Sequence, residues 1–336
     1  MNDPHPYSRL TPDLVLNALE GVGLRCDGRL LALNSYENRV YQVGLEEGGA
    51  ARFVVAKFYR PARWSDAQIL EEHAFGLELA AAEIPVVAPL AFDGRTLLHA
   101  EGFRVAIYPR RGGRAPEMED RDTLEWIGRF IGRIHAVGGA KPFVHRPRLD
   151  LATFAEEPRA FVLASGLVPE DIRPAWKTAI DLAIDAARAA FDRFGKSDEI
   201  RVHGDAHAGN ILWTPATGNA HGGPHFVDLD DARMAPAVQD LWLLLSGERE
   251  SMERQLGHVL RGYEDFREFD DRELALLESL RTLRLIHYQA WLARRWDDPA
   301  FPIAFPWFNT PRYWQDRVLE LREQIAAMQE PPLIPR

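Results

Sequence analysis

The pattern of apolar residues changes at Pro109, and this change limits the folds open to the chain. Before Pro109, short runs rich in β-branched and aromatic residues, such as residues 51–59, are typical of strands, and one amphipathic segment, residues 65–82, has helical spacing. After Pro109, apolar residues recur at helical spacing, as at positions 124, 127, 131 and 134. The sequence therefore predicts an α+β fold of two lobes, in which a small antiparallel sheet with one main helix precedes a larger helical lobe.

The length agrees with two units, because 336 residues are about twice the ordinary domain size of roughly 150. We expect the first lobe over residues 1–108, with a leading helix at about 11–21, and the second over residues 109–336. Within the first lobe, residues 86–92 and 96–102 are two of the expected strands, and a turn at 46–49 joins two others. A surface insertion is expected at residues 214–225.

Charge and cysteine content exclude several classes of protein. The chain has 40 Lys and Arg against 50 Asp and Glu, a net charge of −10, whereas binders of nucleic acid or anionic membranes usually carry a basic surplus. We therefore expect neither partner. The single cysteine, Cys26, cannot form an intramolecular disulfide. Because the N-terminal residues also lack a signal-peptide pattern, we expect a cytoplasmic protein. We also expect a monomer.

The densest group of polar residues lies between apolar runs, in residues 202–212 and 226–231. The first segment contains His203, Gly204 and Asp205 followed by Asn210, and in the second Asp228 is flanked by apolar residues. Flanking strands would hold such loops on a rigid frame and expose their side chains. Two carboxylates and an amide form an oxygen-rich site, which suits Mg²⁺ better than zinc.

This residue set fits phosphoryl transfer, which needs a carboxylate to orient the attacking hydroxyl, a metal on the phosphates and a cation beside them. Asp205 is the candidate base, and Asn210 and Asp228 are the candidate metal ligands. Lys57, on the third expected strand, is the candidate cation, and its alternation with Val55 places it on one face of the sheet.

A carboxylate on the helix at residues 65–82 should hold the Lys57 ammonium in place. Glu72 is our choice, and Glu71 is the alternative, because the two side chains point about 100° apart on a helix and the sequence does not fix the register.

A metal-dependent hydrolase is a competing interpretation of the same loop. His203 and His207 could join Asp205 in a His/Asp metal cluster. We expect His203 instead to brace the loop through hydrogen bonds to the backbone.

In order and context these residues resemble the kinase-like phosphotransferases related to aminoglycoside and choline kinases, whose catalytic loop reads H-G-D-x-x-x-x-N. They are more similar still to the bacterial stress response kinase A family. Five segments of this sequence resemble segments of its members and occur in the same order, between Leu33 and Arg233: LNSYENRVYQ, VAKFYRP, ILEEH, HGDxHAGNILW and FVDLDDAR. The resemblance implies a protein-kinase-like fold, ATP with Mg²⁺, transfer to Ser or Thr of proteins, and a role in bacterial stress response.

Three further residues take their roles from this resemblance. Ser35 would belong to the nucleotide site, although the turn at residues 34–38 lacks the G-x-G-x-x-G of ordinary protein kinases. Asp240 would hydrogen-bond the backbone of the catalytic loop at the start of a long helix, or would be an ordinary acid at a helix N-terminus. Tyr108, by its place along the chain, marks the hinge where backbone groups would receive the adenine edge.

Two other functions remain open at this point. The same fold could phosphorylate a small alcohol, such as an aminoglycoside, choline, homoserine or a sugar, because fold does not decide the acceptor. The chain could also be a nucleotide-binding regulatory protein with little turnover. The presence of Asp205, Asn210 and Asp228 together argues against this last function.

Overall fold

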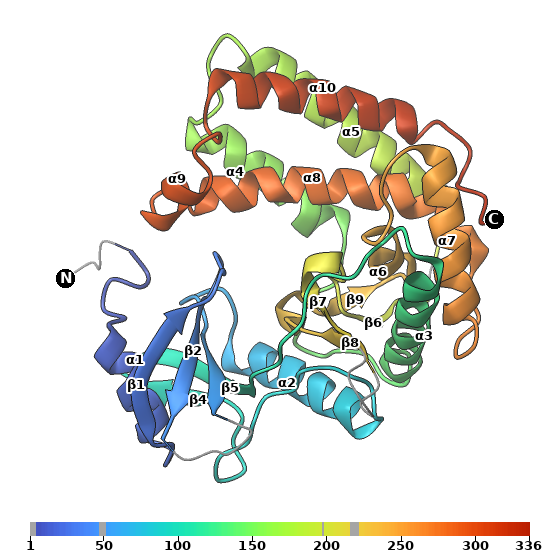
Figure 1. Cartoon of the computed structure of the whole chain (residues 1–336). Coiled ribbons are helices and arrows are strands. Elements are labelled where there is room, and N and C mark those ends of the chain that lie inside the picture. The colour runs from blue at the N-terminus through green and yellow to red at the C-terminus, as the bar shows by residue number, and fades with distance from the viewer. Residues whose placement is uncertain (1–4, 47–51, 197, 216–221) are drawn as a thin grey trace.

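The computed structural model describes residues 5–46, 52–196, 198–215 and 222–336, and it has two lobes (Figure 1). The smaller lobe contains α1 (Pro12–Glu20), β1 (Cys26–Ala32), β2 (Arg39–Leu45), β3 (Phe53–Phe58), α2 (Asp66–Ala81), β4 (Leu98–Ala100) and β5 (Phe103–Pro109). The larger lobe contains α3 (Arg121–Gly138), α4 (Glu157–Ser165), α5 (Arg173–Phe194), β6 (Ile200–Val202), β7 (Ile211–Thr214), β8 (Gly223–Phe226), β9 (Arg233–Ala235), α6 (Val238–Trp242), α7 (Arg249–Tyr263), α8 (Leu277–Arg294), α9 (Ala300–Ala304) and α10 (Pro311–Ala327). The predicted bilobal α+β fold is confirmed.

The sheet of the smaller lobe is antiparallel and has the strand order β1-β2-β3-β5-β4. Val15 and Leu19 of α1 pack with Ala56 of β3 in one buried cluster on one face of this sheet. Successive side chains of a strand point to opposite faces, so Lys57 points away from α1. The register of the sheet therefore directs the ammonium toward the larger lobe.

Helix α2 connects the two lobes through its buried face. Its N-terminus is fixed by a capping box, in which Ser65 and Gln68 satisfy each other's backbone N–H groups. Phe75 and Leu79 are fully buried and belong to the main hydrophobic cluster of the larger lobe. The lobes consequently share a core at this point.

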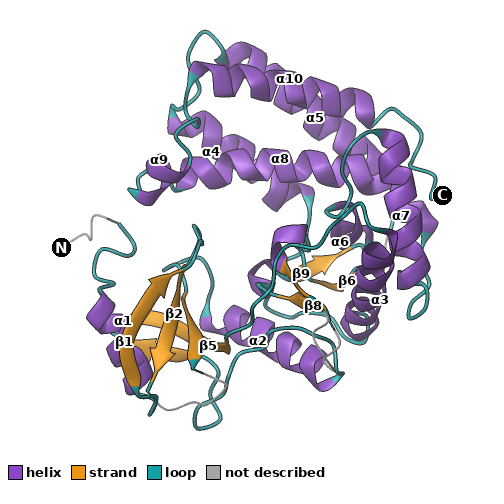
Figure 2. Cartoon of the chain, in the orientation of Figure 1, coloured by secondary structure: helices purple, strands orange, loops and turns teal. Residues whose placement is uncertain are grey.

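The larger lobe is built on close contact between α3 and α7. A Cβ atom at Gly128 would lie 2.1 Å from the carbonyl oxygen of Val259, and one at Gly262 would lie 2.0 Å from that of Glu125. Only glycine allows the helix backbones to approach so closely. Figure 2 shows the short strands of this lobe beside these helices. The helices hold the two-stranded ladders β6–β9 and β7–β8, which carry the polar loops.

Helix α3 of the larger lobe is amphipathic. In α3, Leu124, Ile127 and Ile131 are buried, whereas Trp126 is 45% exposed. In the described part of the chain, no helix combines the length and apolar character needed to cross a membrane.

Two details of the predicted elements are wrong. Residues 86–92 form no strand, because Pro85 and Pro89 interrupt the backbone donors, and only isolated bridges from Val86 to Phe226 and from Phe92 to Arg95 remain. The long helix expected after Asp240 ends at Trp242, and the chain turns at Gly247, whose φ is +84°, before α7 begins.

The leading helix and the other strands of the first lobe are confirmed. The turn expected at residues 46–49 and the middle of the insertion expected at 214–225 fall on residues 47–51 and 216–221, which lie outside the described residues.

Candidate active site

A cavity of about 780 Å³ lies between the lobes and brings together most of the candidate residues. Its walls come from the β1–β2 turn, β3, α2 and β5 on one side, and from the loops after β6 and β8 together with α8 on the other. The predicted site residues that line it are Ser35, Lys57, Glu72, Tyr108, Asp205, Asn210 and Asp228. His203 and Asp240 lie behind the catalytic loop and are fully buried.

His203 connects the two polar loops. Its Nε2 lies 2.9 Å from the carbonyl oxygen of Val227, and its Nδ1 accepts the backbone N–H of Asp205 at 3.3 Å. This pattern requires the tautomer with the proton on Nε2. The ring thereby ties the residue before Asp228 to the backbone of Asp205.

Asp240 fixes the backbone at the start of the same loop. One carboxylate oxygen accepts the N–H of His203 at 2.8 Å and the Nε2 of His135 lies 3.0 Å from it, while the other oxygen accepts the N–H of Gly204 at 2.8 Å. Gly204 has φ +83°, and a Cβ there would lie 2.1 Å from the carbonyl oxygen of Asp231. The loop can therefore take this shape only with glycine at this position.

Asp205 and Asn210 face each other across the turn of the catalytic loop. The Asn210 amide nitrogen donates to the Asp205 carbonyl at 2.9 Å and to its carboxylate at 3.3 Å. Burial raises the pKa of Asp205, but the hydrogen bond from His207 and the charge of Arg284 outweigh it and hold this pKa below its usual value. Asp205 is thus a carboxylate at neutral pH.

Asp228 and Lys57 meet across the cavity. Asp228 has φ +61°, a left-handed conformation that is uncommon for a residue other than glycine, and its side chain is 49% exposed. Its carboxylate lies 2.8 Å from the Lys57 ammonium, and Asp230 lies 3.2 Å from the same group. Burial lowers the pKa of Lys57, but these two carboxylates and that of Glu72 raise it well above its usual value.

Of the two acids considered on α2, Glu72 faces the cavity and Glu71 does not. Glu71 accepts the backbone N–H groups of residues 144–146 at 2.5 to 2.8 Å. Glu72 is buried, and its carboxylate lies 3.9 Å from Arg146. Among the described residues, Lys57 forms its ion pairs with Asp228 and Asp230, and Glu72 acts on it through its charge without an ion pair. Burial raises the pKa of Glu72 to about 7, against the charge of Lys57.

Sequence reasoning missed a group of paired charges in the wall of the cavity. Asp230 pairs with Lys57 and Arg63, and Asp231 pairs with Arg63 at 2.9 Å and Arg233 at 2.8 Å. Burial raises the pKa of Asp230, but Arg63 and Lys57 outweigh it and lower this pKa to about 2. The two acids directly after Asp228 were the available signal, but Arg63 lies 167 residues before Asp230.

The β1–β2 turn is held in place by side chains of the larger lobe. Glu37 lies 3.1 Å from Arg60, accepts the indole N–H of Trp291 at 2.6 Å and lies 2.6 Å from Arg295. Asp298 adds an ion pair to Arg60 at 2.8 Å. Charged contacts across the lobes thus fix a turn that has no glycine.

Tyr108 lies at the end of β5 with its side chain toward the cavity. Its hydroxyl is 3.1 Å from that of Tyr59, which in turn is 2.8 Å from His73. Burial raises the pKa of Tyr108, so the phenol is neutral.

The donor atoms near Asp228 fit Mg²⁺ and do not fit a histidine metal site. Asn210 uses its amide nitrogen on Asp205, which leaves its amide oxygen as an acceptor, and Asp228 offers a half-exposed carboxylate. One or two such ligands are usual for Mg²⁺, which keeps water and substrate phosphates as its other ligands. Both ring nitrogens of His203 contact protein atoms, and the described residues contain no group of three His, Cys, Asp or Glu arranged for a metal.

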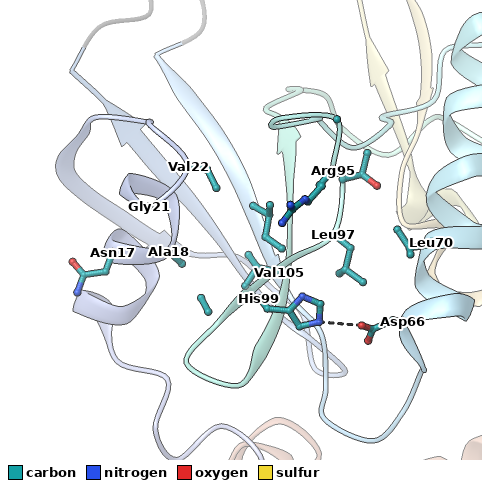
Figure 3. Close-up of a pocket in the computed structure, with 14 residues that line it drawn as sticks. Asn17, Ala18, Gly21, Val22, Asp66, Leu70, Arg95, Leu97, His99 and Val105 are labelled. Carbon is teal, nitrogen blue, oxygen red and sulfur yellow. Dashed lines mark ion pairs between the residues drawn. The ribbon is translucent and has the colours of Figure 1, made fainter.

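A second cavity, of about 640 Å³, lies in the smaller lobe between α1, residues 94–100 and the start of α2. Figure 3 shows His99 and Asp66 paired at its wall, 3.1 Å apart. Apolar side chains such as Leu70 and Leu97 form much of the rest. None of the candidate residues for phosphoryl transfer lines this cavity, whereas seven of them line the cavity between the lobes.

Comparisons with known proteins show the family of this chain. The model of the phosphotransferase enzyme family matches residues 29–302. The chain is 46% identical over 332 residues to stress response kinase A of Escherichia coli K12, and 46% identical over 336 residues to the serine/threonine protein kinase RdoA of Salmonella typhimurium LT2. Each alignment covers 99% of this chain and 98% of the relative.

Solved structures share the fold at low sequence identity. Amicoumacin kinase in complex with AMP-PNP, Ca²⁺ and its ligand has a TM-score of 0.71 at 20% identity, covering 96% of this chain and 95% of that one. Spectinomycin phosphotransferase with ADP and spectinomycin has a TM-score of 0.61 at 15% identity, covering 95% of each chain. The family match and the 46% identity over nearly the full length together show that this chain belongs to the phosphotransferase enzyme family and, within it, to the stress response kinase A group.

Proposed function

We propose that this protein is an ATP- and Mg²⁺-dependent kinase that phosphorylates Ser or Thr hydroxyls of proteins. The observation that carries the proposal is the convergence of Asp205, Asn210, Asp228 and Lys57 on one cavity between the lobes. A carboxylate base, oxygen ligands for a metal and a buried cation are the parts that phosphoryl transfer requires.

Each residue has a chemical role in this proposal. Asp205 would orient the acceptor hydroxyl and take its proton, and Lys57 would contact the phosphates. Asn210 and Asp228 would hold Mg²⁺, which supplies neutralisation of the phosphate charge. Glu72 would act on Lys57 through its charge, because no direct ion pair joins them.

The remaining residues would shape the nucleotide side. The Ser35 hydroxyl, on the turn that Glu37 anchors to the larger lobe, would donate to a phosphate. Backbone groups near Tyr108 would receive the adenine edge. His203 and Asp240 would act on the catalytic loop without touching the substrate.

The choice of a protein acceptor rests on the relatives. The RdoA protein that is 46% identical to this chain is named as a serine/threonine protein kinase. The names of the relatives called stress response kinase A support a role in stress response.

The test is transfer of labelled phosphate from ATP to generic protein substrates, with and without Mg²⁺. Asp205→Asn should reduce incorporation by at least about 10²-fold, because it removes the proton acceptor. Asp185→Asn, an exposed acid of α5 that pairs with Arg188, is the matched control and should keep the wild-type rate. Equal rates for wild type and Asp205→Asn, or transfer that does not need Mg²⁺, would contradict the proposal.

A further inference from the structure

One face of α8 forms the wall of the cavity beside Asp205. Arg284, His287, Tyr288 and Trp291 all line the cavity, and their spacing of three, four and seven residues places them on one side of the helix. Trp291 reaches the β1–β2 turn through Glu37, whereas Arg284 lies at the other end of this face, beside the catalytic loop. This face of α8 and Asp205 therefore line the same cavity, and Figure 1 shows α8 crossing the larger lobe.

Arg284 covers the candidate base. Its guanidinium lies 2.7 Å from one carboxylate oxygen of Asp205, and the Arg284 side chain is 41% exposed. Within the described residues this is the only ion pair that Arg284 forms. A guanidinium has five N–H donors, so most of them remain available to a group that enters the cavity.

Most acids around the cavity already form ion pairs with lysine or arginine side chains of the protein. Three carboxylates that line it are each paired with at least two cations: Glu37 with Arg60, Arg63 and Arg295, Asp230 with Lys57 and Arg63, and Asp231 with Arg63 and Arg233. Asp228 faces Lys57, and Glu72 is buried. A cationic acceptor would therefore meet the Arg284 charge and would find no unpaired carboxylate of these residues beside Asp205.

We propose that Arg284 selects acceptor hydroxyls that stand next to an anionic group, namely Ser or Thr with Asp or Glu beside them, and that it covers Asp205 until such an acceptor arrives. The proposal deepens the proposed function and rests on it. A carboxylate of the acceptor can form the planar two-bond contact that guanidinium groups favour. Arg284 then leaves Asp205, whose oxygen becomes free to meet the hydroxyl.

Phosphoryl transfer to the acceptor hydroxyl then follows. The hydroxyl oxygen forms a bond to the γ-phosphorus of ATP, and the bond from that phosphorus to the leaving oxygen of ADP breaks. The hydroxyl proton passes to the Asp205 carboxylate. Without an acidic acceptor, the ion pair to Arg284 keeps the same carboxylate from activating water.

The test compares peptides that differ only beside a single serine, with Asp, Gln or Lys at the flanking positions. Wild-type protein should phosphorylate the Asp peptide with a kcat/KM at least about tenfold above that for the Lys peptide, mainly through KM. Arg284→Gln should lose this preference, and Arg284→Lys should keep part of it. Arg281→Gln is the matched control: Arg281 lies on the same helix, pairs with Glu278 and does not line the cavity.

ATP hydrolysis without any peptide separates this inference from the proposed function. Arg284→Gln should hydrolyse ATP several-fold faster than wild type, because Asp205 is uncovered, while Arg281→Gln should match wild type. An unchanged peptide preference or an unchanged hydrolysis rate in Arg284→Gln would overturn the role of Arg284. Failure of the wild type to phosphorylate any peptide or protein would instead overturn the protein acceptor, and the hydrolysis comparison would still decide whether Arg284 covers Asp205.

Discussion

Replacing Asp240 tests whether this acid shapes the catalytic loop or is an ordinary acid at a helix N-terminus. Its carboxylate accepts two buried backbone N–H groups, those of His203 and Gly204, each at 2.8 Å. A buried N–H left without a partner costs about 1–3 kcal/mol. Asp240→Ala should therefore lower the free energy of unfolding by about 2–6 kcal/mol.

Asp240→Asn should lower the free energy of unfolding by less than Asp240→Ala does. An amide offers one acceptor oxygen, so its NH₂ group must face one of the two backbone donors, and the expected cost is about 1–3 kcal/mol. An acid that only favours a helix N-terminus would contribute about 0.3–1 kcal/mol. Asp13, in the first turn of α1, is such an acid, and Asp13→Asn is the matched control.

Urea unfolding and kcat for phosphate transfer measure the two effects. Both Asp240 variants should lose kcat because the backbone N–H of Asp205 follows directly on the two donors that Asp240 holds. The control should keep the wild-type kcat. A loss of stability below 1 kcal/mol in Asp240→Ala, with unchanged kcat, would refute the reasoning and return Asp240 to the role of a helix-terminal acid.

Three further changes test other parts of the structure. Lys57→Met should weaken ATP binding at least about tenfold, as calorimetric titration would measure. The free energy of unfolding in urea should fall by less than about 3 kcal/mol, because Asp230 keeps its ion pair with an arginine. Intact ATP binding with a large loss of stability would make Lys57 structural. Gly128→Ala should destabilise the protein by at least about 3 kcal/mol, because its Cβ would lie 2.1 Å from the Val259 carbonyl oxygen, and a near wild-type melting temperature would contradict this. Burial raises the pKa of Glu273 from 4.5 to about 7, so the folded protein holds a proton there that the unfolded chain has released, and stability should fall as pH rises through this window. Glu273→Gln should remove about 3 kcal/mol of that fall between pH 4.5 and 8, as unfolding free energies of both proteins would show.

The parts of the site that the sequence predicts are local in the chain. Asp205 and Asn210 stand five residues apart on one loop, and their relation follows from spacing alone. The face of the sheet on which the Lys57 side chain lies also follows from the sequence. Successive side chains of a strand point to opposite faces, so the burial of its neighbours on one face places Lys57 on the other. The fold class and the family resemblance were predicted from such local patterns and are confirmed.

Contacts between distant residues could not be predicted in this way. The choice between Glu71 and Glu72 depends on how α2 rotates against the larger lobe, and the packing of Phe75 and Leu79 decides it. Arg284 reaches Asp205 from α8, a helix that the sequence places only as one of several in the second lobe. No local pattern indicates which arginine of that region enters the cavity.

The turn at residues 34–38 depends on one of these contacts between distant residues. A glycine-rich turn follows the phosphates through its backbone freedom, but this turn is held through Glu37 by Trp291 of α8. Arg284 of the same helix contacts Asp205, seven residues earlier and so about 10 Å away along the helix axis. One rigid helix therefore sets the separation between the turn at the proposed nucleotide side of the cavity and the proposed base at the acceptor side. Because a helix transmits displacement along its axis with little change in length, a movement of α8 that shifts the turn must also shift Arg284 relative to Asp205.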